Sequence, residues 1–163
     1  MRQIASALAV ILVAPALFAS GVTVRWDPTN PATGPFPNDF LTTPDPTQKS
    51  GRRVNLPMPS DCATAPSDCQ DVQLIDELDG FQTVPRIAVT FSAPIDVNTL
   101  YNAIFYVPLN NQTEEERGIN YFGQKIPINQ IIFDPTTNTV YAKPDGNLDQ
   151  HRHIAIIVTD KIR

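Results

Sequence analysis

The sequence predicts an all-β fold: an antiparallel β-sandwich preceded by a proline-rich extended segment and one short helix. Ile87, Val89 and Phe91 alternate with the residues between them, which is the period of two expected of a strand with one buried face. Similar short apolar runs recur along the chain, with turn-forming residues between them. The chain holds 16 prolines and 7 glycines, and most of the prolines fall between residues 28 and 66, where they exclude long helices.

Residues 1–20 are predicted to be a signal peptide. Arg2 supplies a positive charge, residues 4–18 are nearly all apolar, and Ala19 and Ser20 are small enough for signal-peptidase cleavage. The apolar run is shorter than the ~20 residues that span a bilayer, so no transmembrane segment is predicted. No cysteine lies at the expected cleavage point to carry a lipid anchor. We therefore expect an exported protein, either secreted or held at the cell surface.

Residues 21–66 are predicted to form a proline-rich extended strap. Each proline fixes its own φ and biases the preceding residue away from helix. Trp26, Phe36 and Phe40 make this segment too apolar for a free linker, so we expect it to dock its aromatic side chains on a neighbouring surface. That surface can belong to the same domain or to another, and a disordered tether is the alternative.

Residues 67–163 are predicted to form the sandwich, with the short helix leading into it. Ser67 and Gln70 have the spacing of a capping box, which places the helix at about residues 68–78, ahead of Gly80. Cys62 and Cys69 are predicted to form a structural disulfide that closes a small loop. A redox or metal-binding pair is the alternative, but the C-x-x-C spacing and a second ligand pair are missing.

The remaining strands follow from short apolar runs. Asp96 stands at the N-cap of a turn that packs Leu100 against the sheet. Residues 110–117 read as a solvated loop, and the turn at residues 134–138, D-P-T-T-N, joins the two strands around it into a hairpin. The sequence ends soon after the last strand, so we expect it to be part of a longer polypeptide with downstream domains. The predicted strands are Ile104–Val107, Gln130–Phe133, Thr139–Ala142 and Ile154–Val158.

No catalytic or cofactor-binding residue is predicted. A serine hydrolase needs the motif G-x-S-x-G, and no serine here is framed by glycines in that way. Ser92 lies in F-S-A-P, where a proline stands in place of a helix N-terminus. Phosphate-binding and dinucleotide-binding glycine patterns are missing as well, so no cofactor is expected. A net charge of −5 and a pI near 4.8 argue against nucleic acid as a partner.

Two sets of residues have a metal-binding alternative, although no metal is predicted. His151 and His153 lie on one side of a strand and could ligate zinc, but the buried face that we assign to Ile154 and Ile156 places both outward, beside Arg152. The acidic residues of the turns and of the helix end could ligate calcium, but their spacing lacks the usual loop pattern, and we interpret them as turn and helix caps. These residues are Asp27, Asp39, Asp45, Asp76, Glu77 and Asp79.

Two resemblances to known families cover nearly all of the chain after residue 20. Residues 78–162 resemble the bacterial SbsA-type Ig-like domains first named for S-layer proteins, through V-T-F-S-A-P-I-D-V-N-T-L, F-D-P-T-T-N-T-V-Y-A-K-P and I-A-I-I-V-T-D. From Trp26 on, the chain also resembles the N-terminal region of bacterial virulence-factor lipases, through W-D-P-T-N-P, P-F-P-N-D-F-L and L-I-D-E-L-D-G-F-Q-T. The first resemblance implies an Ig-like β-sandwich. The second implies an extracellular protein whose catalysis belongs to a following α/β-hydrolase domain, although the lipoprotein cysteine common in that family is missing here.

The favoured hypothesis is a non-catalytic Ig-like accessory module at the N-terminus of a larger secreted or cell-surface protein, in contact with downstream domains of the same polypeptide. One alternative is the N-terminal portion of a secreted lipase or esterase whose hydrolase domain lies beyond this sequence. The other is an adhesin or S-layer-like binding module. In each case we expect this chain itself to hold no enzyme activity.

Overall fold

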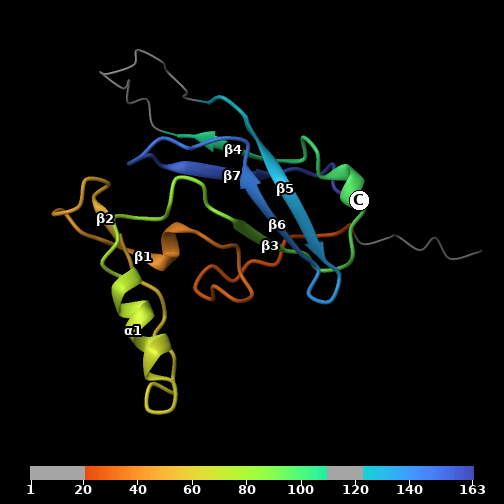
Figure 1. Cartoon of the computed structure of the whole chain (residues 1–163). Helices are drawn as coiled ribbons and strands as arrows, with labels where there is room; N and C mark the ends of the chain where they lie inside the picture. Colours follow the sequence, from red (N-terminus) through yellow and green to blue (C-terminus); the bar gives the residue numbers. More distant parts are fainter. Residues whose placement is uncertain (1–20, 110–122) are drawn as a thin grey trace, which may run out of the picture.

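The computed structural model describes residues 21–109 and 123–163, so the expected signal peptide and the expected loop at 110–117 lie outside it. Within those ranges the fold is all-β and sandwich-like, with one short α-helix, which confirms the predicted fold class. A five-stranded antiparallel sheet has the strand order β3-β6-β5-β4-β7, and a separate two-stranded sheet pairs β1 with β2 (Figure 1).

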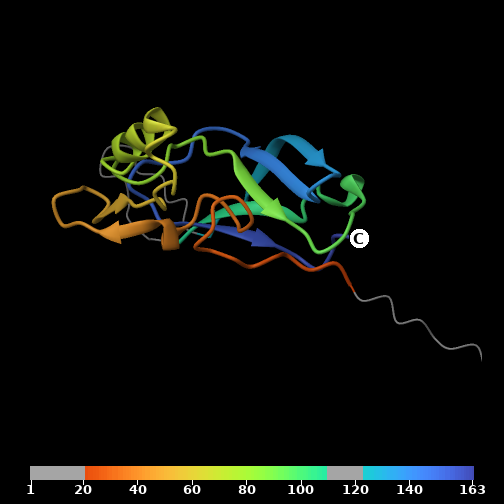
Figure 2. The same cartoon turned by 90° about the horizontal axis from the view of Figure 1, so that it is seen from below.

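The five-stranded sheet curls into two layers because β5 bends. The first residues of β5, Ile126 and Pro127, pair with β4, whereas the strand from Ile128 onward pairs with β6. A register shift between Asn129 and Ile132 marks the bend, since such a bulge increases local twist. Figure 2 shows β3, β6 and β5 lying over β4 and β7. The strands are β3 (Ile87–Thr90), β4 (Ile104–Pro108), β5 (Ile126–Asp134), β6 (Thr139–Pro144) and β7 (Ile154–Val158).

The hydrophobic core lies between these two layers. Ile87, Val89 and Phe91 are each at most 2% exposed, which confirms the alternation that predicts β3. Leu100 is fully buried, and Asp96 caps the 3₁₀ turn η2 (Val97–Thr99) by accepting a hydrogen bond from the Asn98 N–H at 3.0 Å, also as predicted. The core side chains are Ile87, Val89, Phe91, Leu100, Ala103, Ile104, Tyr106, Ile128, Val140, Ala142, Leu148 and Ile162.

The predicted hairpin is formed by β5 and β6, although β5 begins earlier than its apolar run suggests. Its turn is held by Asp134, whose Oδ1 accepts hydrogen bonds from the N–H and the hydroxyl of Thr136 at 2.8 and 2.6 Å. These bonds, that of the Thr136 side chain first, lower the pKa of Asp134. The turn therefore forms from local aspartate and threonine chemistry.

The strap is ordered along the outer edge of β3 and belongs to the same domain. Phe36 and Ala88 exchange backbone hydrogen bonds of 3.1 and 2.7 Å, and the Arg25 N–H donates to the Thr90 carbonyl at 2.8 Å. Between these two contacts the chain makes a turn that needs glycine at Gly34, because a Cβ there would collide with the Asp27 carbonyl. Figure 2 shows this N-terminal segment, in red and orange, running beside the sandwich.

A smaller unit extends from the sandwich at the end opposite Arg163 (Figures 1 and 2). It consists of the 3₁₀ turn η1 (Asp39–Leu41), β1 (Thr42–Pro44), β2 (Arg52–Val54) and α1 (Pro66–Ile75). Leu41 and Val54 are buried within it, and the Val54 N–H donates to the Leu78 carbonyl at 3.0 Å. The β1–β2 pair is not predicted by the sequence, because its strands of three residues are too short to show alternation.

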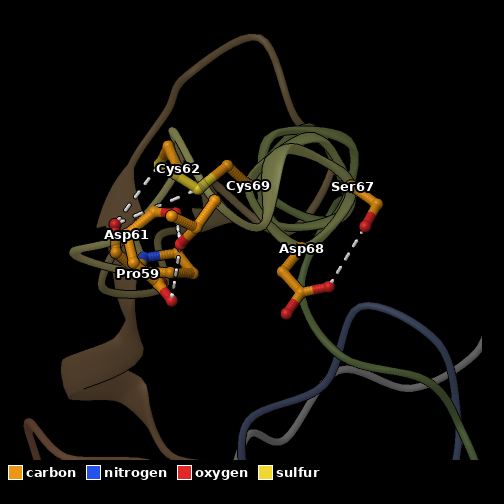
Figure 3. Close-up of a disulfide and its surroundings, with 7 residues drawn as sticks. Pro59, Asp61, Cys62, Ser67, Asp68 and Cys69 are labelled. Atoms are coloured by element: carbon orange, nitrogen blue, oxygen red, sulfur yellow. Dashed lines mark hydrogen bonds between the residues drawn. A yellow bond between two sulfur atoms is a disulfide. The ribbon is translucent and has the colours of Figure 1, made fainter.

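The predicted capping box at the start of the helix is wrong. The helix α1 begins at Pro66, its N-cap is Ala65, and no side chain caps it. The Ser67 hydroxyl instead donates to Asp68 at 3.3 Å (Figure 3). Proline suits the first helical position, since its fixed φ is helical and its missing N–H has no partner there in any case. The helix consequently starts before Ser67, and it ends at Ile75 rather than near Leu78.

Candidate functional site

A cavity of about 350 Å³ lies against β3 and β7, the two end strands of the five-stranded sheet. Its apolar lining includes Ala88 and Val89 of β3 and Ile154, Ile156 and Val158 of β7. Trp26, Pro35 and Pro37 of the strap line it as well. We call this cavity the groove. It is lined by residues far apart in the sequence, and the docked strap supplies part of that lining.

Asp79 connects two segments at the groove. Its carboxylate accepts hydrogen bonds from the backbone N–H groups of Lys49 and Ser50, both at 3.1 Å. It also lies 3.3 Å from Nδ1 of His151. Hydrogen bonding from Ser50 is the main cause that lowers the pKa of Asp79, with smaller contributions from a positive charge on His151 and from the Lys49 N–H. Asp79 therefore ties the β1–β2 connection to the segment that enters β7.

Arg152 is the residue whose position the sequence analysis gets wrong. Its side chain is only 7% exposed and lines the groove, whereas we predict it outward beside the histidines. Arg152 precedes Ile154, the first residue of β7, by two positions, and both residues line the groove. Its Nε lies 3.9 Å from Oδ2 of Asp149.

The predicted surface histidines, His151 and His153, are both exposed. Ser92 has a structural role. His151 pairs with Asp79, and His153 also lines the groove. The Ser92 hydroxyl oxygen accepts a hydrogen bond from the Thr23 N–H at 3.0 Å, while the Ser92 N–H donates to the Thr23 carbonyl at 2.8 Å. Ser92 therefore anchors the start of the strap.

The acidic residues with a calcium alternative mostly brace turns in the structure. Asp27 accepts hydrogen bonds from Thr29 and Thr33, Asp45 accepts from Thr47, and Asp76 accepts from the Leu56 N–H at 2.8 Å. The Thr47 hydroxyl is the main cause that lowers the pKa of Asp45. Asp39 and Glu77 lie in the 3₁₀ turn η1 and just after α1. Across residues 21–109 and 123–163, no group of three or more His, Cys, Asp or Glu residues is placed to hold a metal ion.

Cys62 and Cys69 are joined in a disulfide, with their Cα atoms 5.6 Å apart (Figure 3). Cys69 lies in the first turns of α1 and is buried, while Cys62 lies in the preceding turn. The bond ties the beginning of the helix to the strap. A closed loop of this size stabilises its segment by about 2–3 kcal/mol through the unfolded chain.

The aromatic side chains of the strap divide into two kinds. Phe36 packs on Phe81 with an edge-to-face geometry and a centroid distance of 5.6 Å. Trp26 and Phe40 contact each other in a T-shaped pair at 6.4 Å, but they remain 68% and 64% exposed. The expectation that the strap docks all of its aromatics is therefore wrong for this pair, which stands on the surface. Of the two residues, Trp26 also lines the groove.

Comparison with known proteins places the chain in no family. No protein-family model matches it, and no curated protein matches it either. Among solved structures, the N-terminal part of the bacterial S-layer protein SbsC is loosely similar, with 13% identity and a TM-score of 0.31. That match covers 59% of this chain and spans 23% of the SbsC chain, and a score this low establishes no common fold. The likeness to virulence-factor lipases rests on the sequence motifs alone.

In the described part of the chain, no helix is both long and apolar enough to cross a bilayer.

The substitution Asp79→Asn tests the connection that Asp79 makes. Because the folded pKa of Asp79 lies below its unfolded value of 3.8, its carboxylate stabilises the fold above that pH, and the effect is lost as pH falls through the folded pKa. We expect D79N to lower the free energy of unfolding by about 1 kcal/mol at neutral pH and to cost progressively less below about pH 4. Urea unfolding across this pH range measures it.

The matched control is Asp160→Asn, which removes an exposed carboxylate elsewhere on the surface and should leave stability nearly unchanged. A cost of D79N that stays constant from neutral pH to about pH 2.5 contradicts the assignment.

Proposed function

We propose that this chain is a non-catalytic accessory module of a larger secreted or cell-surface protein, and that it contacts a neighbouring domain of that protein through Trp26 and Phe40. The observation that supports this is the exposure of the pair, 68% and 64%, on a strap whose backbone is hydrogen-bonded to β3. Large aromatic side chains are enriched in the centres of protein interfaces, where they contribute most of the binding energy.

The strap presents this pair on a well-ordered backbone. The Asn38 side chain donates to the Pro28 carbonyl at 3.0 Å and accepts from the Phe40 N–H at 2.8 Å, so it connects the two ends of the turn between Trp26 and Phe40. Arg25, next to Trp26, is bonded through its N–H to Thr90 of β3. Side chains held on an ordered backbone lose less conformational entropy when they bind a partner.

The hydrogen bonds of Ser92 support the proposal that the chain is non-catalytic. Its hydroxyl oxygen and N–H are both engaged with the backbone of Thr23, so its polar groups hold the strap in place. A hydrolytic serine must instead offer its hydroxyl to a substrate, with a base beside it.

The coding sequence that follows Arg163 distinguishes the alternatives for the larger protein. A G-x-S-x-G motif after a strand favours the lipase or esterase alternative. Further repeats of F-S-x-P-x-D favour the adhesin or S-layer-like alternative. Both outcomes are compatible with an accessory role for this chain, whereas neither bears on the contact through Trp26 and Phe40.

Hydroxyl-radical footprinting tests that contact directly. We expect Trp26 and Phe40 to be oxidised more slowly in the full-length protein than in this chain alone, because the neighbouring domain covers them. Tyr101, which is 71% exposed and stands on the sandwich after η2, is the internal control and should react at the same rate in both. Equal oxidation of Trp26 in the two proteins rules out the contact.

An ester-hydrolysis assay tests the non-catalytic assignment. We expect this chain to hydrolyse p-nitrophenyl butyrate no faster than buffer does, and the variant Ser92→Ala to behave in the same way. Saturable turnover that a serine-directed phosphonate abolishes would overturn the assignment, and loss of that turnover in S92A would identify the nucleophile.

A further inference from the structure

The groove is lined by apolar residues of β7 and by a buried cation, Arg152. Ile154, Ile156 and Val158 of β7 line the groove, and Arg152, two residues before the strand, lines it as well. More than nine-tenths of the Arg152 side chain is buried, since 7% of it is exposed. A guanidinium carries a permanent charge and five N–H donors, and burying it is costly unless those donors have partners.

The protein supplies Arg152 with an incomplete set of partners. Among the described residues, Asp149 is its polar partner. The distance of 3.9 Å from Nε of Arg152 to Oδ2 of Asp149 is longer than a hydrogen bond. In that same part of the chain, the one side-chain atom that is both shielded from solvent and without a partner is Oδ1 of Asn138, so any Arg152 nitrogen without a partner keeps some exposed surface. Arg152 itself lines the groove.

The other arginine of the groove differs in this respect. Arg52 donates from Nε to the Thr42 hydroxyl at 2.6 Å and from Nη2 to the carbonyls of Asp39 and Thr42 at 3.3 Å. Its donors are therefore used within the protein. Asp79, one of the carboxylates of the groove, is likewise engaged by N–H donors and by His151. Of the two arginines of the groove, Arg152 is the one that makes no hydrogen bond to another described residue.

We infer that the groove binds a small apolar carboxylate, whose carboxylate group pairs with the Arg152 guanidinium while its apolar body lies along Ile154, Ile156 and Val158. Arginine and carboxylate match in a two-pronged geometry, and such charge-assisted bonds are the strong ones in a partly dry site. A cavity of about 350 Å³ is at the small end of ligand pockets and suits a ligand of about ten to fifteen non-hydrogen atoms.

Arg152 sets the sign of the ligand and its orientation. An anion gains from Arg152, whereas a cation would be repelled by its guanidinium. Asp39, Asp79 and Asp149 also line the groove, and they repel a carboxylate, so Arg152 is the side chain that favours its binding. A neutral molecule of the same shape fills the apolar part but leaves the guanidinium without a partner.

Titration with n-octanoate tests the inference, with n-octanol and n-octylammonium as probes of the same length. Trp26 is the one tryptophan of the chain and lines the groove, so its fluorescence reports binding. We expect octanoate to bind with a dissociation constant in the millimolar range, and the other two probes at least about tenfold more weakly. Equal binding of all three probes, or no octanoate binding up to about 20 mM, overturns the inference.

Three variants locate the carboxylate. Arg152→Met keeps an unbranched apolar stem but removes the guanidinium, and it should weaken octanoate binding by about tenfold or more. Asp149→Asn removes the competing carboxylate and should tighten binding. Arg25→Met, at an exposed arginine outside the groove, should change nothing. Methyl chemical shifts of Ile154 and Ile156 should move on titration of the wild type.

R152M is expected to weaken octanoate binding and D149N to tighten it. Circular dichroism shows whether R152M folds, and if it does not, D149N still tests the inference. Octanoate binding that D149N leaves unchanged or weakens contradicts the inference, as does a folded R152M that binds octanoate like the wild type.

Discussion

The structure depends on β3 having hydrogen-bonded neighbours along both of its edges. β6 pairs with one edge, where Ile87 lies opposite Ala142, and the strap pairs with the other edge through Phe36. The edge of a sheet exposes unpaired N–H and C=O groups that can recruit other chains, and here the strap satisfies them. Because the side chains of β3 lie in the core, the strap is placed relative to the core and to β7, and the groove between them follows from that placement.

Short-range and long-range polar contacts do different work in this protein. Asp45 and Asp134 accept hydrogen bonds from threonines two residues further on, so each stabilises its own turn. Asp79 and Ser92 instead join segments that lie far apart in the sequence. The first kind explains why an acidic chain rich in proline and threonine makes tight turns. The long-range contacts hold the strap and the β1–β2 connection in place on the sandwich. The exposed pair of Trp26 and Phe40 needs this fixed backbone to present its side chains to a partner.

The sequence predicts the features that depend on neighbouring residues. The alternation in β3, the cap at Asp96 and the β5–β6 hairpin are confirmed, because each follows from side chains within a few positions of one another. The start of the helix is mispredicted, because Pro66 and Ser67 both suit a helix N-terminus and only packing decides between them. Contacts across many residues, such as those that bury Arg152 in the groove, depend on pairings that no local pattern encodes.

Native-state hydrogen exchange at Ala88 is the most direct test of this account. The Ala88 N–H donates to the Phe36 carbonyl of the strap and makes no bond within the five-stranded sheet, so its exchange rate reports the strap alone. The account predicts that Ala88 exchanges as slowly as the amides that join β3 to β6, within about a factor of ten. An Ala88 amide that exchanges like an unprotected peptide, while the β3–β6 amides remain protected, would show that the strap is not part of the fold.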